Sequence, residues 1–323
     1  MDSRASKISY QVRHVRHYSG NNGLYLRRFY PEDLRKLINY FEIDTIVWRY
    51  RIHPPPELAL TLLCARLSYP YRFIDLQNLF GRSETWLKLV FADTLDHMYL
   101  RYKKLLHWHP TLTYERMKHY ADVLDRESDV DCVWGFIDGT FRPFCRPGVR
   151  QQEMYSGYKK LHGFKVQGVC TPDGLLVSCD GPYEGKVNDL TMVRKSGIEK
   201  RLREIFTNEA EPLALYGDQA YKSCTYIFGP YKDYEEDRLK ARFNVVLSSI
   251  RISVEQIFGK NSNLFSMNQL RIGLRPGSMP VAAYWMVAAL LTNCHTCLYG
   301  SQIATRFNCK PMSLEEYLQV EGM

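Results

Sequence analysis

The chain has 323 residues, of which 45% are hydrophobic and 24% are charged. This composition is typical of a folded globular protein and excludes a disordered chain. No continuous apolar run reaches the roughly 20 residues that a membrane-spanning helix needs. The formal net charge is +8, and all of the excess lies in residues 1–120, which hold 19 Lys and Arg against 11 Asp and Glu. Such a basic region suits a phosphate-rich partner, or it is an arm that is merely solvated by its charge.

The cysteines and the N-terminus indicate an intracellular protein with reduced thiols. The chain has nine Cys residues, an odd number, and its N-terminus lacks the apolar segment of a secretory signal. Cys294 and Cys297 form the one Cys-x-x-Cys pair, and no second pair completes a zinc site. Both lie in an apolar stretch that starts at Pro280. We expect this stretch to be a buried core helix, with no membrane contact.

Residues 1–54 are predicted to be a basic lead-in arm that ends in a short amphipathic helix. The arm is rich in Arg and His. The helix has the sequence PEDLRKLINYF, in which apolar residues recur at helical spacing from Leu34 to Phe41. Three prolines, Pro54 to Pro56, end this region, and Pro56 suits the first turn of a following helix.

Residues 55–125 are predicted to be a helical region of helix-turn-helix type. Gly81 ends one helix and Ser83 is a suitable N-cap for the next. In a DNA-binding helix-turn-helix the first residues of the second helix reach base edges. Here these residues are Arg82, Ser83, Glu84, Thr85 and Lys88. Many helical bundles have the same pattern without touching DNA, so a purely structural bundle stays open.

Residues 126–323 differ in texture, because short apolar runs divided by Gly and Pro replace the helical periodicity. The predicted strands are CVWGFID (132–138), GFKVQGVC (163–170), LLVSC (175–179) and LALYGD (213–218). The predicted helices cover 188–206 and about 239–258. Strands followed by alternating strands and helices around one core indicate a mixed α/β domain.

Three acidic residues stand in an unusual setting in this second region. Asp138 and Asp218 each close an apolar strand, and Glu255 lies on the long predicted helix. A carboxylate at the end of a buried strand is costly unless a cation neutralises it. Acids that converge from separate elements therefore suggest a divalent metal site, and oxygen ligands without His or Cys select Mg²⁺ or Mn²⁺. The alternative is that the two aspartates lie in ordinary turns and that Glu255 is an exposed helix residue.

A basic group follows the first acid, which suits a substrate that carries phosphate. Its members are Arg142, Arg146, Arg150, Lys159, Lys160 and Lys165. Cleavage of a phosphodiester needs mainly charge stabilisation, which two metal ions about 3.5–4 Å apart supply. Of the basic group, we expect Lys160 and Lys165 to contact DNA.

An ordered set of motifs resembles one known family. The motifs are GFIDGT, MYSGYKKLHGFKVQGVCTPDGL, GPYEGKVNDLTMV, LYGDQAY, SVEQIFG and AALLTNCHTCLYG. In this order they resemble the PIF/Harbinger superfamily of transposases and their domesticated nuclease relatives, over roughly residues 55–320. The resemblance implies a ribonuclease-H-like fold with an acid triad, the DDE set, at Asp138, Asp218 and Glu255. It also implies Asp189 as an additional metal ligand, although Asn188 precedes it where the family more often has His.

The resemblance further implies the setting in which the chain works. It implies DNA as the substrate, a helix-turn-helix ahead of the nuclease, and a separate Myb/SANT-type partner protein for targeting. The expected location is the nucleus, or the cytoplasm until import with the partner, and a homo-oligomer is compatible with it. Two rival readings stay open. One is a domesticated DNA-binding or scaffolding protein without catalysis, and the other is a hydrolase of small phosphate esters.

Overall fold

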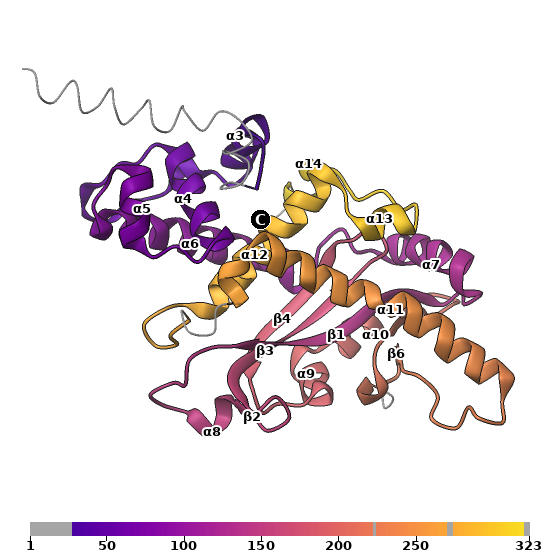
Figure 1. Ribbon diagram of the computed structural model, residues 1–323. Helices are drawn as coiled ribbons and strands as arrows, with labels where there is room; N and C mark the ends of the chain where they lie inside the picture. Colours follow the sequence, from indigo (N-terminus) through magenta and orange to yellow (C-terminus); the bar gives the residue numbers. More distant parts are fainter. Residues whose placement is uncertain (1–27, 222–223, 270–273, 320–323) are drawn as a thin grey trace, which may run out of the picture.

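The computed structural model describes residues 28–221, 224–269 and 274–319 (Figure 1). The elements before the sheet are all helical: α3 (Pro31–Tyr40), η1 (Ile43–Thr45), η2 (Arg49–Arg51), α4 (Pro56–Ser68), α5 (Phe73–Phe80), α6 (Glu84–His107) and α7 (Tyr114–Ser128). The basic arm predicted at the start of the chain lies almost wholly outside the described residues. The short helix predicted after it is confirmed as α3.

Both strands and helices occur after α7. The first group is β1 (Val133–Pro143), α8 (Gln151–Met154), β2 (Tyr155–Ser156), β3 (Leu161–Cys170), β4 (Leu176–Glu184), α9 (Asp189–Ser196) and α10 (Ile198–Phe206). The second group is β5 (Ala214–Tyr216), η3 (Gln219–Tyr221), β6 (Ile227–Phe228), α11 (Arg238–Leu264), η4 (Ser266–Gln269), α12 (Val281–Tyr299), α13 (Gln302–Arg306) and α14 (Leu314–Leu318).

The sheet is mixed, with β1 at the change of direction. Its strand order is β2-β3-β1-β5-β6, and β4 pairs with β3. On one side of β1, the pairs β1–β3 and β3–β4 are antiparallel. On the other side, the pairs β1–β5 and β5–β6 are parallel. The predicted mixed α/β architecture with flanking helices is confirmed.

The second half of the chain differs from the sequence prediction at two places. The strand predicted to end at Asp138 continues to Pro143, because β3 pairs with it along the whole extension. The single helix predicted for 188–206 is two helices, α9 and α10. Gly197 separates them with a φ of 67°, a left-handed conformation that glycine adopts at little cost. Both differences bear on the acids. The first places Asp138 in the middle of a strand, and the second makes Asp189 the first residue of a short helix, α9.

The helical region packs directly on the sheet region. Ser83 is the N-cap of α6, as predicted, and its side chain accepts a hydrogen bond from the backbone N–H of Trp86. Gly81 takes the left-handed conformation at the end of α5. Helix α6 then runs on to pack against both α12 and β4. The predicted boundary between residues 125 and 126 falls within α7, and the buried hydrophobic residues form one continuous core.

Helix α12 is a core helix. It is long and apolar enough to cross a membrane by length and composition, with a mean hydropathy of 1.3 over its apolar window. In the fold, however, 78% of that window is buried among the other elements. Its contacts with α6, α11, β4 and α14 explain its apolar sequence. Figure 1 shows α12 between the helices α3–α6 and the sheet.

Candidate active site

Asp138 lies at the centre of β1 with its side chain largely covered. The side chain is 20% exposed, and Oδ1 accepts a hydrogen bond from the backbone N–H of Gly139 at 2.8 Å. Oδ2 lies 3.6 Å from Nη1 of Arg251. Burial raises the pKa of Asp138 to about 6, while Arg251 opposes the shift and the negative charges of Asp218 and Asp189 add to it. The carboxylate is therefore held in a place that favours a neighbouring cation.

The parallel pairing of β1 with β5 brings Asp218 beside Asp138. Phe136 and Tyr216 are register partners, and each aspartate stands two residues further along its own chain. The register therefore places both acids at the same level of the sheet, Asp138 within β1 and Asp218 just after the end of β5. Oδ1 of Asp218 accepts from the backbone N–H of Ala220 at 2.8 Å, which fixes the turn after β5.

Glu255 lies on α11 and is joined to Asp138 through one guanidinium group. Nη2 of Arg251 lies 3.4 Å from Oε1 of Glu255, and Nη1 of the same group faces Asp138. Arg251 and Glu255 are four residues apart, so they lie on one face of the helix. The Glu255 side chain is 58% exposed. The structure thus places Glu255 near Asp138, with an arginine between them.

Asp189 reaches β1 from the opposite face of the sheet. It is the first residue of α9, after Asn188, whose side chain caps the helix by accepting from the backbone N–H of Thr191 at 2.9 Å. A Cβ atom at Gly139 would lie 2.8 Å from Oδ1 of Asp189, so only glycine lets this carboxylate approach the strand.

The same oxygen of Asp189 forms an ion pair with Nζ of Lys165 at 3.2 Å. Successive residues of a strand point to opposite faces, so Asp138 and Gly139 face different sides. The register partner of Asp138, Gly168, faces Phe258 of α11. Asp189 therefore stands on the face opposite to α11.

Sequence reasoning missed two side chains at this site. Arg251 contacts two of the predicted acids, and its spacing of four residues before Glu255 was the available signal. Tyr221 is fully buried, and burial raises the pKa of its phenol, with Asp189, Asp138 and Asp218 adding to the shift. Its hydroxyl has no hydrogen-bond partner among the described residues. Tyr221 is the last residue of the LYGDQAY motif, and its place three residues after Asp218 was the available signal.

The carboxylate oxygens of the acids suit a hard divalent cation, but the side chains do not converge closely enough to coordinate one ion together. Within residues 28–221, 224–269 and 274–319, no three His, Cys, Asp or Glu side chains are grouped closely enough to hold an ion. Arg251 and Lys165 instead provide the positive charge beside the carboxylates. The oxygen-only donors, the raised pKa of Asp138 and the unpartnered Tyr221 hydroxyl nevertheless fit a polar site that takes a cation.

The residues predicted to contact DNA are placed in different ways. Arg82 lies over the ring of Trp86, with 5.1 Å between its Cζ atom and the ring centroid. Lys88 forms an ion pair with Glu84 at 2.7 Å.

The remaining predicted contacts also differ in their surroundings. Ser83 caps its own helix, and Thr85 is exposed. Lys160 is exposed at a turn, whereas Lys165 is only 19% exposed and pairs with Asp189. DNA contact by these residues stays a prediction.

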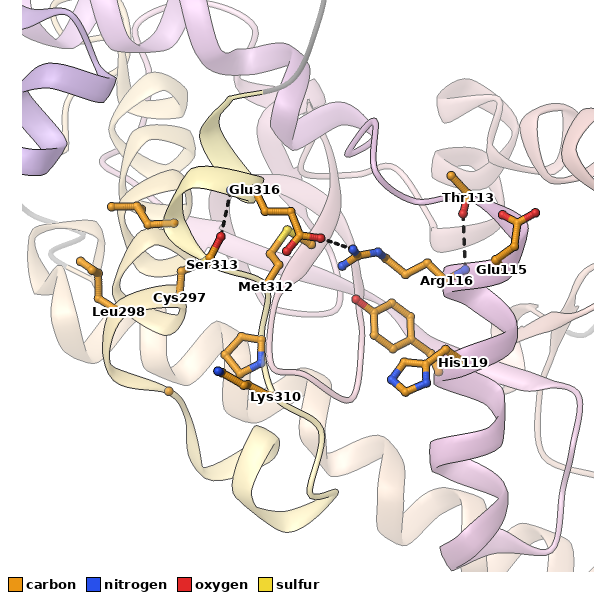
Figure 2. A pocket seen from close by; sticks show the side chains of 14 residues that line it. Thr113, Glu115, Arg116, His119, Cys297, Leu298, Lys310, Met312, Ser313 and Glu316 are labelled. Carbon is orange, nitrogen blue, oxygen red and sulfur yellow. Dashed lines mark hydrogen bonds and ion pairs between the residues drawn. The ribbon is translucent and has the colours of Figure 1, made fainter.

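A cavity of about 1010 Å³ lies away from the acids, between α7 and the C-terminal segments (Figure 2). None of the four predicted metal ligands lines it. Its polar groups pair with one another: Arg116 donates to Glu316, and the backbone N–H of Arg116 donates to Oγ1 of Thr113. A small-molecule hydrolase would be expected to place its acids in such a cavity. Asp138 and Asp189 lie instead at the inner strand β1 of the sheet.

Comparison with known proteins gives the class of this region. Residues 137–293 match the family model described as a DDE superfamily endonuclease. The matched range starts one residue before Asp138 and includes Asp189, Asp218 and Glu255. The region from β1 to α12 is therefore similar to endonucleases of the DDE superfamily.

A transposase is also similar to the chain. Over 152 residues the chain is 27% identical to a protein described as a probable transposase for insertion sequence element IS702, from Microchaete diplosiphon. The similarity covers 43% of this chain and 52% of the relative, so the chain spans about half the length of the curated relative that it matches. No solved structure matches. The comparisons support an endonuclease or transposase, and the narrower PIF/Harbinger assignment stays a prediction.

Proposed function

We propose that the chain is a divalent-metal-dependent DNA endonuclease of transposase type. The catalytic acids are Asp138, Asp218 and Glu255, and Asp189 is an additional ligand. The single observation that carries the proposal is the alignment of Asp138 with Asp218 at the same register step of two parallel strands. Similarity to DDE superfamily endonucleases over residues 137–293 supports the same assignment.

The chemistry follows from where the charges stand. Mg²⁺ or Mn²⁺, when bound, supplies a Lewis acid for the phosphoryl oxygens and activates water or a 3′-hydroxyl. Asp138 would hold the cation from within β1 and Asp218 from the turn after β5, and Glu255 would complete the set from α11. Arg251 must then release Glu255, because its guanidinium lies between the two acids. The freed guanidinium is well placed to bind a phosphate oxygen, which arginine does bidentately.

The narrower parts of the proposal concern family and setting. The strand order, with β1 antiparallel to β3 and parallel to β5, is that of a ribonuclease-H-like sheet and supports this fold. We place the chain with the PIF/Harbinger transposases and their domesticated relatives. On this proposal it acts in the nucleus, with DNA and a Myb/SANT-type protein as partners, and the helices α5 and α6 contribute DNA binding.

A nicking assay tests the proposed activity. Purified full-length chain and supercoiled plasmid in Mg²⁺ should give nicked circles, and EDTA should abolish them. Asp138→Asn should slow nicking more than about 100-fold, because the site loses a negative ligand for the cation that stabilises the transition state. The matched control is Asp122→Asn, at an exposed position on α7 that should leave the rate unchanged. Equal rates for Asp138→Asn and the parent would contradict the assignment.

The first rival function, a catalytically silent DNA-binding protein, has its own outcome in this assay. Such a protein would bind duplex DNA, with an affinity that falls steeply with salt. It would give no nicked circles with Mg²⁺ or with Mn²⁺. Binding without nicking by the parent chain would therefore favour the rival.

A further inference from the structure

The hairpin of β2 and β3 ends in a four-residue turn, residues 157–160. The pairing of Ser156 with Leu161 closes the turn. Inside it, the backbone N–H of Lys159 donates to Oγ of Ser156 at 3.3 Å, and Lys160 takes a left-handed conformation with a φ of 52°. The backbone of the turn therefore has a defined conformation.

The aromatic ring of Tyr158 is exposed to solvent at the tip of this turn. Tyr158 is 89% exposed, although a tyrosine ring is among the largest apolar groups that a protein can bury. Nζ of Lys159 lies 5.0 Å from the centroid of the Tyr158 ring. A single exposed aromatic needs no explanation. Here, however, the ring carries a cation on one face and leaves the other face open to a second planar group.

The charged side chains of the hairpin are all basic. No Asp or Glu occurs between Glu153 and Asp173, and the charged residues in between are Lys159, Lys160 and Lys165. Lys159 and Lys160 are both exposed. Exposed cations beside an open aromatic face are the combination that binds unpaired nucleotides, because bases stack on the ring and phosphates contact the lysines.

Strand β3 connects the tip to the acids. Lys160 precedes the strand, and Lys165, within it, contacts Asp189. Gly168, the register partner of Asp138, lies further along the same strand. The tip is therefore several nucleotides away from the acids along a bound DNA strand. Figure 1 shows β2 at the edge of the molecule, away from the helices α3–α6.

We infer that the tip of the β2–β3 hairpin is a stacking site for an unpaired DNA base, with Tyr158 as the platform and Lys159 and Lys160 on the flanking phosphates. The inference rests on the proposed function, because it takes DNA as the substrate. It adds a preference that the acids alone do not give. The chain should favour DNA in which a nucleotide several positions from the cleaved bond is unstacked or single-stranded.

Binding of labelled oligonucleotides to the full-length chain tests this inference. Fluorescence anisotropy compares a single strand, a duplex with one unpaired nucleotide and a fully paired duplex. Tyr158→Ala should weaken binding to the first two about tenfold, because one base loses its stacking partner. It should change binding to the paired duplex less than twofold. Replacing both Lys159 and Lys160 with Ala should reduce the salt dependence for the single strand by about 1.4 in log–log slope.

Two control variants separate stacking from other effects. Tyr158→Phe keeps the ring and should bind within twofold of the parent. Tyr234→Ala removes an exposed tyrosine from another segment and should also have no effect. Equal thermal unfolding of all variants shows that they fold, which the exposure of Tyr158 predicts.

The outcomes distinguish the inference from the proposed function. If Tyr158→Ala binds every oligonucleotide as well as Tyr158→Phe does, the stacking site is wrong, although a nicking enzyme remains. If a glutamate-rich peptide competes fully at the lysines and Tyr158→Ala has no effect, the tip binds acidic protein instead. If the parent chain binds no DNA at all, both the inference and the proposed function fail.

Discussion

The two faces of the sheet hold their acids in different ways. On the α11 face, Asp138 and Glu255 share one arginine, and the glutamate is mostly exposed. On the α9 face, Asp189 is held by the start of a capped helix, by the space above Gly139 and by Lys165. Each acid would have to leave a basic partner to bind a cation, Glu255 the arginine and Asp189 the lysine. On the proposed function, the α11 face carries two of the catalytic acids and the α9 face contributes the additional ligand Asp189.

Cleavage rates of variants on the two faces give the largest expected effect. Glu255→Gln should lower the nicking rate about 100-fold, because it removes a negative charge beside the metal site. Asp189→Asn should lower it less than about tenfold, because Lys165 already neutralises much of the charge of this additional ligand. Initial rates in Mg²⁺ measure both, with Glu204→Gln on α10 as an exposed control. A larger loss for Asp189→Asn than for Glu255→Gln would reverse the comparison.

The second prediction concerns the stability of Asp138→Asn and its dependence on pH. The expected effect is smaller, and this variant should gain stability although it loses activity. In EDTA, Asp138→Asn should raise the free energy of unfolding by about 3 kcal/mol at pH 8. The pKa of Asp138 is about 6 in the fold against an ordinary value of 3.8, so the folded protein holds the proton more tightly. Stability is therefore lost as pH rises from about 4 to 6, and the loss persists above pH 6.

Asn stays neutral throughout this range and keeps the acceptor oxygen for Gly139. The gain of Asp138→Asn should therefore vanish below pH 4, where the parent is protonated in both states. Urea unfolding at pH 4 and pH 8 checks this. A variant that is less stable than the parent at pH 8 would show that Asp138 is not a strained charge.

The sequence was sufficient for what depends on local patterns. Helix α6 begins where Ser83 offers a cap, and the apolar strand before Asp138 is buried as its composition requires. The residues after it, GTFRP, look like a turn, yet they form strand because β3 lies alongside. Pairing with a distant strand overrides a weak local preference, and no local pattern reveals it.

The candidate site shows the same limit. Asp138 and Asp218 could be predicted because each follows an apolar run, and Arg251 could have been found from its spacing to Glu255. The ion pair between Lys165 and Asp189 could not, because it joins β3 to α9 across the fold. The face on which an acid stands depends on strand register, which one sequence does not display.

Calorimetric titration of the apo chain with Mn²⁺ tests the central claim, that the acids form one cation site, most directly. The parent should bind Mn²⁺, Asp138→Asn should weaken binding at least about tenfold, and Asp122→Asn should bind as the parent does. Binding to the parent should also release the Arg251 pairing, so the heat should depend on ionic strength. Absence of binding to the parent, or equal affinity in Asp138→Asn, would contradict a shared metal site.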